Sequence, residues 1–145
     1  MALNKIVAIY IAMFLTMISY GVAYAKDVEI DMLNKLGKEK MVYSVDVTKV
    51  DVGGTITWLP KDKGHNVHFI KAPEGIKLVK SKLNKKFTYK FEKPGIYLYQ
   101  CTPHRAMGMI GLVIVGDEIS NKESIAKAKV YGKSKKKLKK LLGDL

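Results

Sequence analysis

Cysteine and histidine are scarce in this chain, and acidic residues are half as numerous as basic ones. Its 145 residues include one cysteine, Cys101, and three histidines, with 26 basic and 13 acidic side chains. A single cysteine excludes an internal disulfide. No Ser/His/Asp set and no pair of carboxylates is arranged as hydrolytic enzymes require, so we do not expect an enzyme.

Charge is also missing from the N-terminal segment. Lys5 is followed by an apolar run over residues 6–22 and by Ala23-Tyr24-Ala25, the small-x-small pattern after which signal peptidase cuts. This pattern predicts a secretory signal peptide at residues 1–25 and an exported, periplasmic domain at residues 26–145. An uncleaved membrane anchor is the alternative, because the run approaches the length that spans a bilayer. The Ala-x-Ala pattern and the polar residues after it favour cleavage.

Export makes the single thiol informative. A free cysteine in an oxidising compartment is a liability unless something occupies it, and a bond to a metal is one such occupation. A buried, inert cysteine is the alternative. Without the leader the net charge is about +12. This charge predicts an anionic partner, which is an acidic protein patch, nucleic acid or a membrane surface.

Short β-like segments with alternating or apolar residues fill the first part of the exported domain. They lie at residues 28–33, 41–43, 45–50, 55–59, 87–91, 96–99 and 112–115, with Gly- and Pro-containing turns between them. The spacing predicts an all-β sandwich or barrel over residues 26–117. Residues 77–84 are ambiguous and are compatible with a short helical turn.

The chain changes character in a tail over residues 118–145. Ser120 or Asn121 can cap a first helix, and Gly132 ends it. Residues 133–145 predict a second, basic helix with an apolar stripe that packs on the sandwich, formed by Leu138, Leu141, Leu142 and Leu145. We expect the tail to lie away from the metal-binding end. Its six lysines within residues 133–140 suggest nucleic acid or heparin, but export and the lack of interleaved aromatics argue against this.

The residues with metal-binding chemistry cluster directly after the segment at 96–99. Cys101, His104, Met107 and Met109 offer a thiolate, an imidazole and two thioethers within nine residues. Soft sulfur donors hold Cu(I), and imidazole serves both oxidation states of copper. One Cys, two His and a weak axial Met form the electron-transfer type of copper site. His65, in the turn after the segment at 55–59, fits as the second histidine.

Three alternatives qualify this site. His68 lies three residues beyond His65, an odd offset that points it to the other face of a strand, so we expect it to be a bystander. Either Met107 or Met109 can be the thioether ligand, and spacing alone does not choose between them. Zinc also binds Cys and His, but thioethers are poor zinc ligands.

The motifs Lys63-Gly64-His65-Asn66, Cys101-Thr-Pro-His104 and Ala106-Met-Gly-Met109, with the two-helix tail, resemble those of the pseudoazurins. These are type 1 (blue) copper proteins of the cupredoxin family, and the resemblance covers nearly all of residues 26–145. It implies a Greek-key β-sandwich with two C-terminal α-helices, one copper ion, and the ligands His65, Cys101, His104 and Met109. It also implies that the Asn66 backbone N–H bonds the cysteine sulfur.

The function implied by the resemblance is single-electron transfer by a monomer in the periplasm. Its expected partners are acidic redox proteins, such as nitrite reductase, nitrous oxide reductase and cytochrome donors. Lys35, Lys63 and Lys80 match positions around the docking patch. Gln100 and Arg105 depart from the pattern, and we expect both near that patch. A copper chaperone or storage protein is the alternative function.

Overall fold

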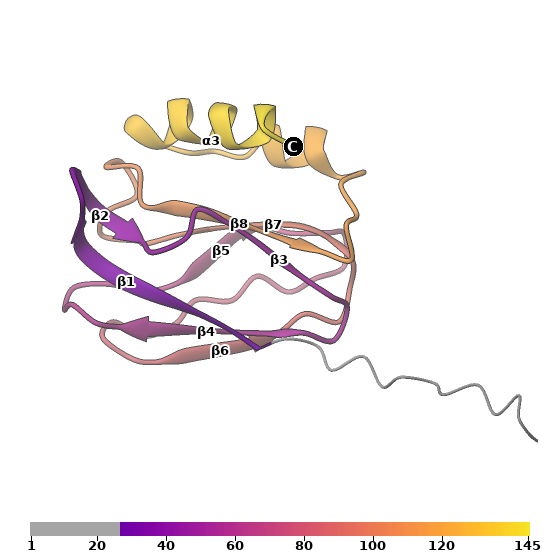
Figure 1. Cartoon of the computed structure of the whole chain (residues 1–145). Helices are drawn as coiled ribbons and strands as arrows, with labels where there is room; N and C mark the ends of the chain where they lie inside the picture. Colours follow the sequence, from indigo (N-terminus) through magenta and orange to yellow (C-terminus); the bar gives the residue numbers. More distant parts are fainter. Residues whose placement is uncertain (1–26) are drawn as a thin grey trace, which may run out of the picture.

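Eight strands and two helices make up residues 27–145, which are the residues that this computed structural model describes (Figure 1). The predicted signal peptide at residues 1–25 lies outside the described residues. The strands are β1 (Val28–Leu36), β2 (Glu39–Tyr43), β3 (Val47–Val50), β4 (Thr55–Pro60), β5 (His68–Lys71), β6 (Phe87–Lys90), β7 (Gly95–Gln100) and β8 (Ile110–Val115). The helices are α2 (Lys122–Ala126) and α3 (Lys133–Gly143). Within the described range, no helix is long and apolar enough to cross a membrane.

The strands form two four-stranded sheets that pack face to face. One sheet has the order β2-β1-β4-β6, and the other has the order β3-β8-β7-β5. The pairs β1–β4 and β3–β8 are parallel, and the remaining pairs are antiparallel. The predicted β-sandwich with two C-terminal helices is confirmed.

The alternation along β7 divides its side chains between two cores. Tyr97, Tyr99 and Cys101 point between the sheets, whereas Ile96 and Leu98 pack under the helical tail. Every residue of β7 and β8 is buried, because the opposite sheet covers one face and the tail covers the other (Figure 1). The same alternation therefore puts the Cys101 thiol at the end of the central core.

The tail differs from its sequence prediction in two respects. Asn121 occupies the N-cap position of α2, but its side chain makes no capping hydrogen bond; it instead accepts from the Ile96 N–H and donates to the Ile96 carbonyl, both at 2.9 Å. The expectation that the tail lies away from the metal-binding end is wrong for the start of α3. Lys133 N–H donates to the Ala106 carbonyl oxygen at 2.9 Å, inside the loop that carries the candidate ligands. The leucine stripe predicts a packed helix but not the end of the sandwich at which the helix begins.

The sequence patterns did not predict β5, and they left residues 77–84 ambiguous. β5 did not stand out because it has only four residues, yet its Phe69 is fully buried in the central core. Residues 77–84 contain no helical turn; Lys80 instead forms an isolated bridge with His68 of β5.

Candidate metal centre

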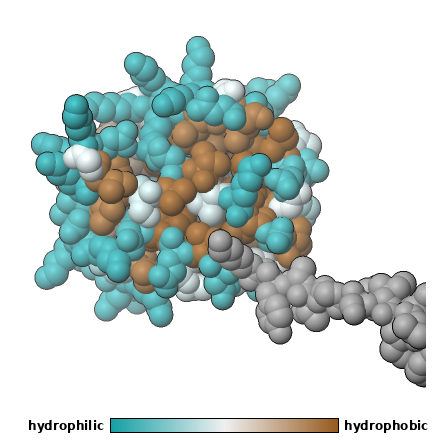
Figure 2. Space-filling view, in the orientation of Figure 1, coloured by the Kyte–Doolittle hydropathy of each residue, from teal (hydrophilic) through white to brown (hydrophobic). Residues whose placement is uncertain are grey.

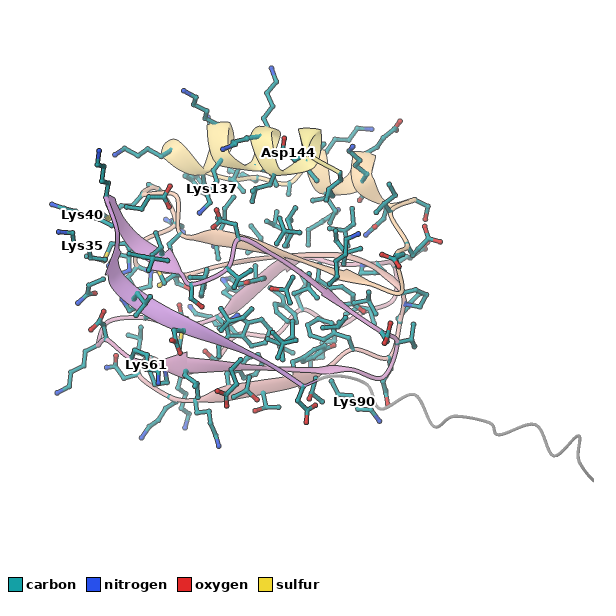
Figure 3. The ribbon with its side chains drawn as sticks, viewed as in Figure 1. Lys35, Lys40, Lys61, Lys90, Lys137 and Asp144 are labelled. Carbon is teal, nitrogen blue, oxygen red and sulfur yellow. The ribbon has the colours of Figure 1, made fainter. Side chains whose placement is uncertain are left out.

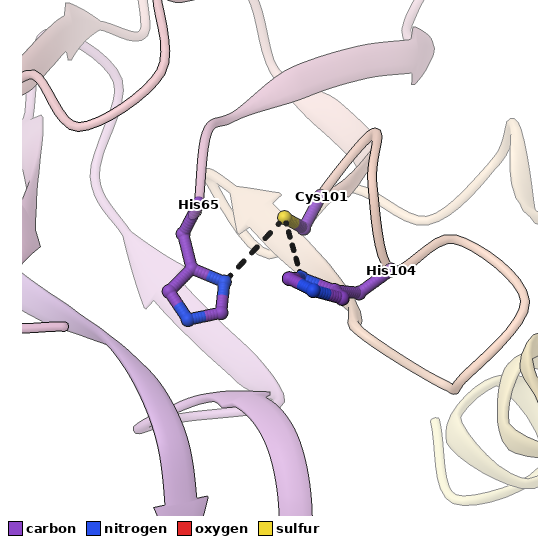
Figure 4. Close-up of side chains that lie close together, drawn as sticks. All are labelled: His65, Cys101 and His104. Atoms are coloured by element: carbon purple, nitrogen blue, oxygen red, sulfur yellow. Dashed lines mark hydrogen bonds between the residues drawn. The ribbon is translucent and has the colours of Figure 1, made fainter. Parts of the chain in front are cut away.

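Two loops meet at one end of the sandwich and bring three metal-binding side chains together. His65 lies in the loop between β4 and β5, and Cys101 and His104 lie in the ligand loop, residues 101–109, between β7 and β8. The Cys101 Sγ is 3.6 Å from His65 Nδ1 and 3.4 Å from His104 Nδ1 (Figure 4). The three donor atoms all lie within 4.8 Å of one another.

Hydrogen bonds within the ligand loop fix its shape. Cys101 N–H donates to the Met109 carbonyl at 2.9 Å and closes the base of the loop. Inside it, His104 N–H donates to the Cys101 carbonyl at 3.2 Å, and Met107 N–H donates to the His104 carbonyl at 2.9 Å. The loop is therefore two consecutive tight turns, which carry Cys101 and His104 on the same side.

Asn34 orients the His65 ring from the side opposite Cys101, and the sequence alone gives no sign of this role. The His65 Nε2 lies 2.8 Å from Asn34 Oδ1 at the end of β1. Because an amide oxygen only accepts, Nε2 carries the proton and Nδ1 presents its lone pair toward Cys101. Asn34 precedes His65 by 31 positions, so only the fold shows that the two side chains are in contact.

Asn66 ties the two loops together. Its Oδ1 accepts from Thr102 N–H at 2.8 Å, and its Nδ2 donates to Thr102 Oγ1 at 3.2 Å. Its carbonyl accepts from the Tyr43 hydroxyl at 2.8 Å. Asn66 is 1% exposed. The loop of His65 and the loop of Cys101 therefore move as one unit.

Burial shifts the pKa of all three candidate donors toward the neutral form. It raises the pKa of the Cys101 thiol, while hydrogen bonding from the backbone N–H groups of Asn66 and His104 lowers it. The Asn66 contribution agrees with the predicted N–H to sulfur bond. Burial lowers the pKa of His65, with help from His104, and burial alone lowers the pKa of His104. Both imidazoles are therefore held neutral, which is the form that binds metals.

Comparisons with known proteins agree with this geometry. Residues 30–116 match the model of the copper-binding proteins of the plastocyanin/azurin family. Pseudoazurin from Paracoccus pantotrophus is 39% identical over 117 residues, which cover 79% of this chain and 81% of that protein. The chain belongs to the plastocyanin/azurin family. Its cofactor is copper.

Solved structures of pseudoazurins are similar to this chain in both fold and sequence. The pseudoazurin from Sinorhizobium is 40% identical with a TM-score of 0.77, over 81% of this chain and 94% of that one. The pseudoazurin from Methylobacterium extorquens AM1 is 36% identical with a TM-score of 0.77, over 82% of this chain and 98% of that one. The likeness therefore extends from the sandwich into the tail.

Exposure distinguishes the candidate ligands of this copper protein. His65, Cys101 and Met109 are fully buried, whereas His104 is half-buried. Met107, the alternative thioether, is 46% exposed. Burial favours Met109 over Met107 as the thioether near copper, and it makes His104 the candidate ligand nearest to solvent.

The remaining predicted residues fall outside the site. His68 lies on β5 and is not part of the cluster found among the described residues. Arg105 is exposed beside the site, with its guanidinium 4.8 Å above the ring of Tyr131. Gln100, the last residue of β7, directly precedes Cys101 and is only 5% exposed, so its side chain offers little surface to a partner.

Proposed function

We propose that this chain carries single electrons between periplasmic redox proteins, with copper held by His65, Cys101, His104 and Met109. The convergence of one thiol and two imidazole Nδ1 atoms within 4.8 Å carries the proposal. The pseudoazurin relatives support a blue copper electron-transfer protein. The donor set supports the same conclusion, because a thiolate, two imidazoles and a thioether suit both Cu(I) and Cu(II).

The protein's part in electron transfer is to keep these donors still. Copper supplies the one-electron exchange when bound. Asn34 holds the His65 ring, and Asn66 locks the two ligand-bearing loops together. Little rearrangement then accompanies a change of charge at the site. His104 is the exit for the electron, since it is the half-buried donor and the others are closed off.

An absorption spectrum of the oxidised, copper-loaded protein tests the proposal. A thiolate bonded to Cu(II) should give an intense visible absorption band, which makes the protein blue. A copper chaperone or storage protein, the alternative function, would hold colourless, exchangeable Cu(I). The fully buried Cys101 argues against open exchange. A colourless protein after oxidation would contradict the electron-transfer proposal.

We also propose that residues 1–25 direct export and that residues 26–145 work as a periplasmic monomer. The lone thiol supports this, because the copper site gives Cys101 an occupation in an oxidising compartment. Mass spectrometry of the protein purified from periplasmic extracts should show a chain that begins at Lys26. A chain that retains the leader would support the anchor alternative.

Lysines surround the copper end and suit an acidic partner. Asn34, which contacts His65, is followed by Lys35; Lys63 precedes Gly64, which lies beside His104; Lys80 lines a groove with Pro103. A second groove of about 390 Å³, which Met107 lines, contains four more lysines and one acidic residue: Lys38, Lys40, Lys133, Lys137 and Glu39. Figure 2 shows hydrophilic side chains projecting along the left and upper edges of the molecule. Figure 3 places Lys35 and Lys40 at the end opposite Lys90.

Met109→Gln should lower the reduction potential by about 60 mV or more, the one-electron equivalent of a tenfold shift in equilibrium. The reason is that a harder oxygen donor in place of the Met109 thioether would favour Cu(II) over Cu(I) when copper is bound. Met107→Gln is the matched control and should change the potential much less, because its side chain is exposed. Voltammetry of both variants gives the comparison. A larger effect at Met107 would reverse the thioether assignment.

His104 should make the potential rise in mild acid. Burial lowers the pKa of this imidazole, and copper competes with the proton, so protonation occurs below the ordinary value of about 6.5. Only the reduced protein takes up this proton, because Cu(I) tolerates three ligands. Proton uptake therefore stabilises the reduced form, and the potential rises by up to about 59 mV per pH unit below this range. A potential that stays flat down to pH ~4.5 would contradict the exit role of His104.

A further inference from the structure

The tip of the ligand loop has two carbonyl groups that find their partners in the tail. Among the hydrogen bonds of residues 27–145, the Arg105 and Ala106 carbonyls accept none from within the loop. Ser134 Oγ donates to the Arg105 carbonyl at 2.6 Å, and Lys133 N–H donates to the Ala106 carbonyl at 2.9 Å. These carbonyls lie between two of the proposed copper ligands, His104 and Met109.

The tail backbone approaches the loop closely because Gly132 permits it. Gly132 has φ 51° and ψ −129°, a conformation that favours glycine. A Cβ atom at this position would overlap the Ala106 carbonyl oxygen and come within 3.1 Å of the Ala106 Cβ. Ser134, two residues later, is fully buried although its side chain is polar. Gly132, Lys133 and Ser134 therefore form a continuous contact with the loop tip.

The other end of this contact is anchored to the sandwich. Leu138, Leu141 and Leu142 of α3 are at most 7% exposed and pack on Ile110 and Leu112 of β8. β8 begins directly after Met109. The ligand loop therefore leads into the strand on which α3 packs, and the start of α3 contacts the loop in turn. Lys137 adds an ion pair to Asp46, at 2.5 Å, near the start of β3. The segment that contacts the loop tip is thus anchored to a rigid sheet and not to another loop.

We propose that Ser134 is a positioning residue for the copper site, which acts through the Arg105 carbonyl on the placement of His104 and Met109. Gly132 and the Lys133 amide complete this contact with the loop tip, and we call residues 132–134 the clamp. The inference rests on the copper ligands assigned under the proposed function. Loss of the Ser134 hydroxyl leaves the Arg105 carbonyl without its partner and frees the segment between the two ligands.

Ser134→Ala is the direct test, and Leu142→Ala is the matched control, since it weakens the same helix away from the loop. In copper-loaded protein, Ser134→Ala should change the visible spectrum and the potential, and Leu142→Ala should leave both at wild-type values. In metal-free protein, Ser134→Ala should speed hydrogen exchange at the Lys133 and Met107 amides by roughly fivefold to tenfold. Amides of the β1–β4 pair should not change.

Gly132→Ala provides a second variant, because its added methyl group pushes directly on the Ala106 carbonyl. It should alter the spectrum in the same direction as Ser134→Ala. If both variants lose stability as Leu142→Ala does, with unchanged spectrum, potential and loop exchange, the clamp is only structural and the proposal is wrong. If the wild-type protein is not blue, the ligand assignment fails, while the exchange experiment still decides whether the clamp holds the loop.

Discussion

Cys101→Ala should abolish the blue colour of the protein and all electron transfer through it. The thiol is the only one in the chain, and both candidate imidazoles face it at 3.6 Å and 3.4 Å. An alanine at this position supplies no donor to copper and no charge-transfer band. Absorption spectra of the copper-treated variant and stopped-flow mixing with a redox partner would measure the two losses.

The fold of this variant should survive. Its core between the sheets contains large aromatic side chains, such as Trp58 and Phe69, and needs no metal to close. We expect a loss of about 1 kcal/mol in the free energy of unfolding. Met107→Ala, in the same loop, is the control and should remain blue. A Cys101→Ala protein that folds and stays blue would contradict the site.

Association with an acidic redox partner should be tenfold to a thousandfold faster at low salt than at high salt. Residues 26–145 have a net charge of about +12, and lysines lie on both sides of the candidate ligands. The screening length is about 30 Å at 0.01 M salt and about 10 Å at 0.1 M, so the advantage should fall steeply across this range. Stopped-flow rates with a nitrite reductase, measured against ionic strength, test this expectation.

Single charge reversals locate the face that docks. Lys35→Glu, Lys63→Glu and Lys80→Glu should slow association without changing the spectrum, and Lys90→Glu at the opposite end is the matched control (Figure 3). The start of α3 is at the copper end, so Lys133→Glu should behave like the first group. Equal salt sensitivity in all variants would reduce the lysines to a non-specific charge.

The sequence predicts the sandwich and the candidate donors because both rest on local patterns. Alternation in β7 continues to Cys101, and a turn directly after β4 holds His65, so two strand ends at one edge suffice to bring the donors together. The ligand loop also carries its chemistry within nine residues of sequence. No knowledge of distant contacts is needed for these conclusions.

The missed features all depend on pairing between distant parts of the chain. β5 has four residues and is recognisable only through its ladder with β7. Asn34 matters because β1 ends beside His65, which is 31 positions further along the chain. Ser134 contacts Arg105 across 29 positions. Helix periodicity predicts which side of α3 is buried, but the loop that its first turn contacts is set by the fold.

The direction of β1 determines which end of the sandwich faces a surface or a fused domain when the protein is attached through the start of this strand. The strand begins at Val28 on the far side of the sandwich and ends near Asn34, which touches His65 (Figure 1). Its nine residues span about 26 Å. A tether joined ahead of Val28, such as a linker to an electrode or a fused domain, would hold the molecule by its distal end. His104 would then face outward, so immobilised protein should still exchange electrons with partners in solution.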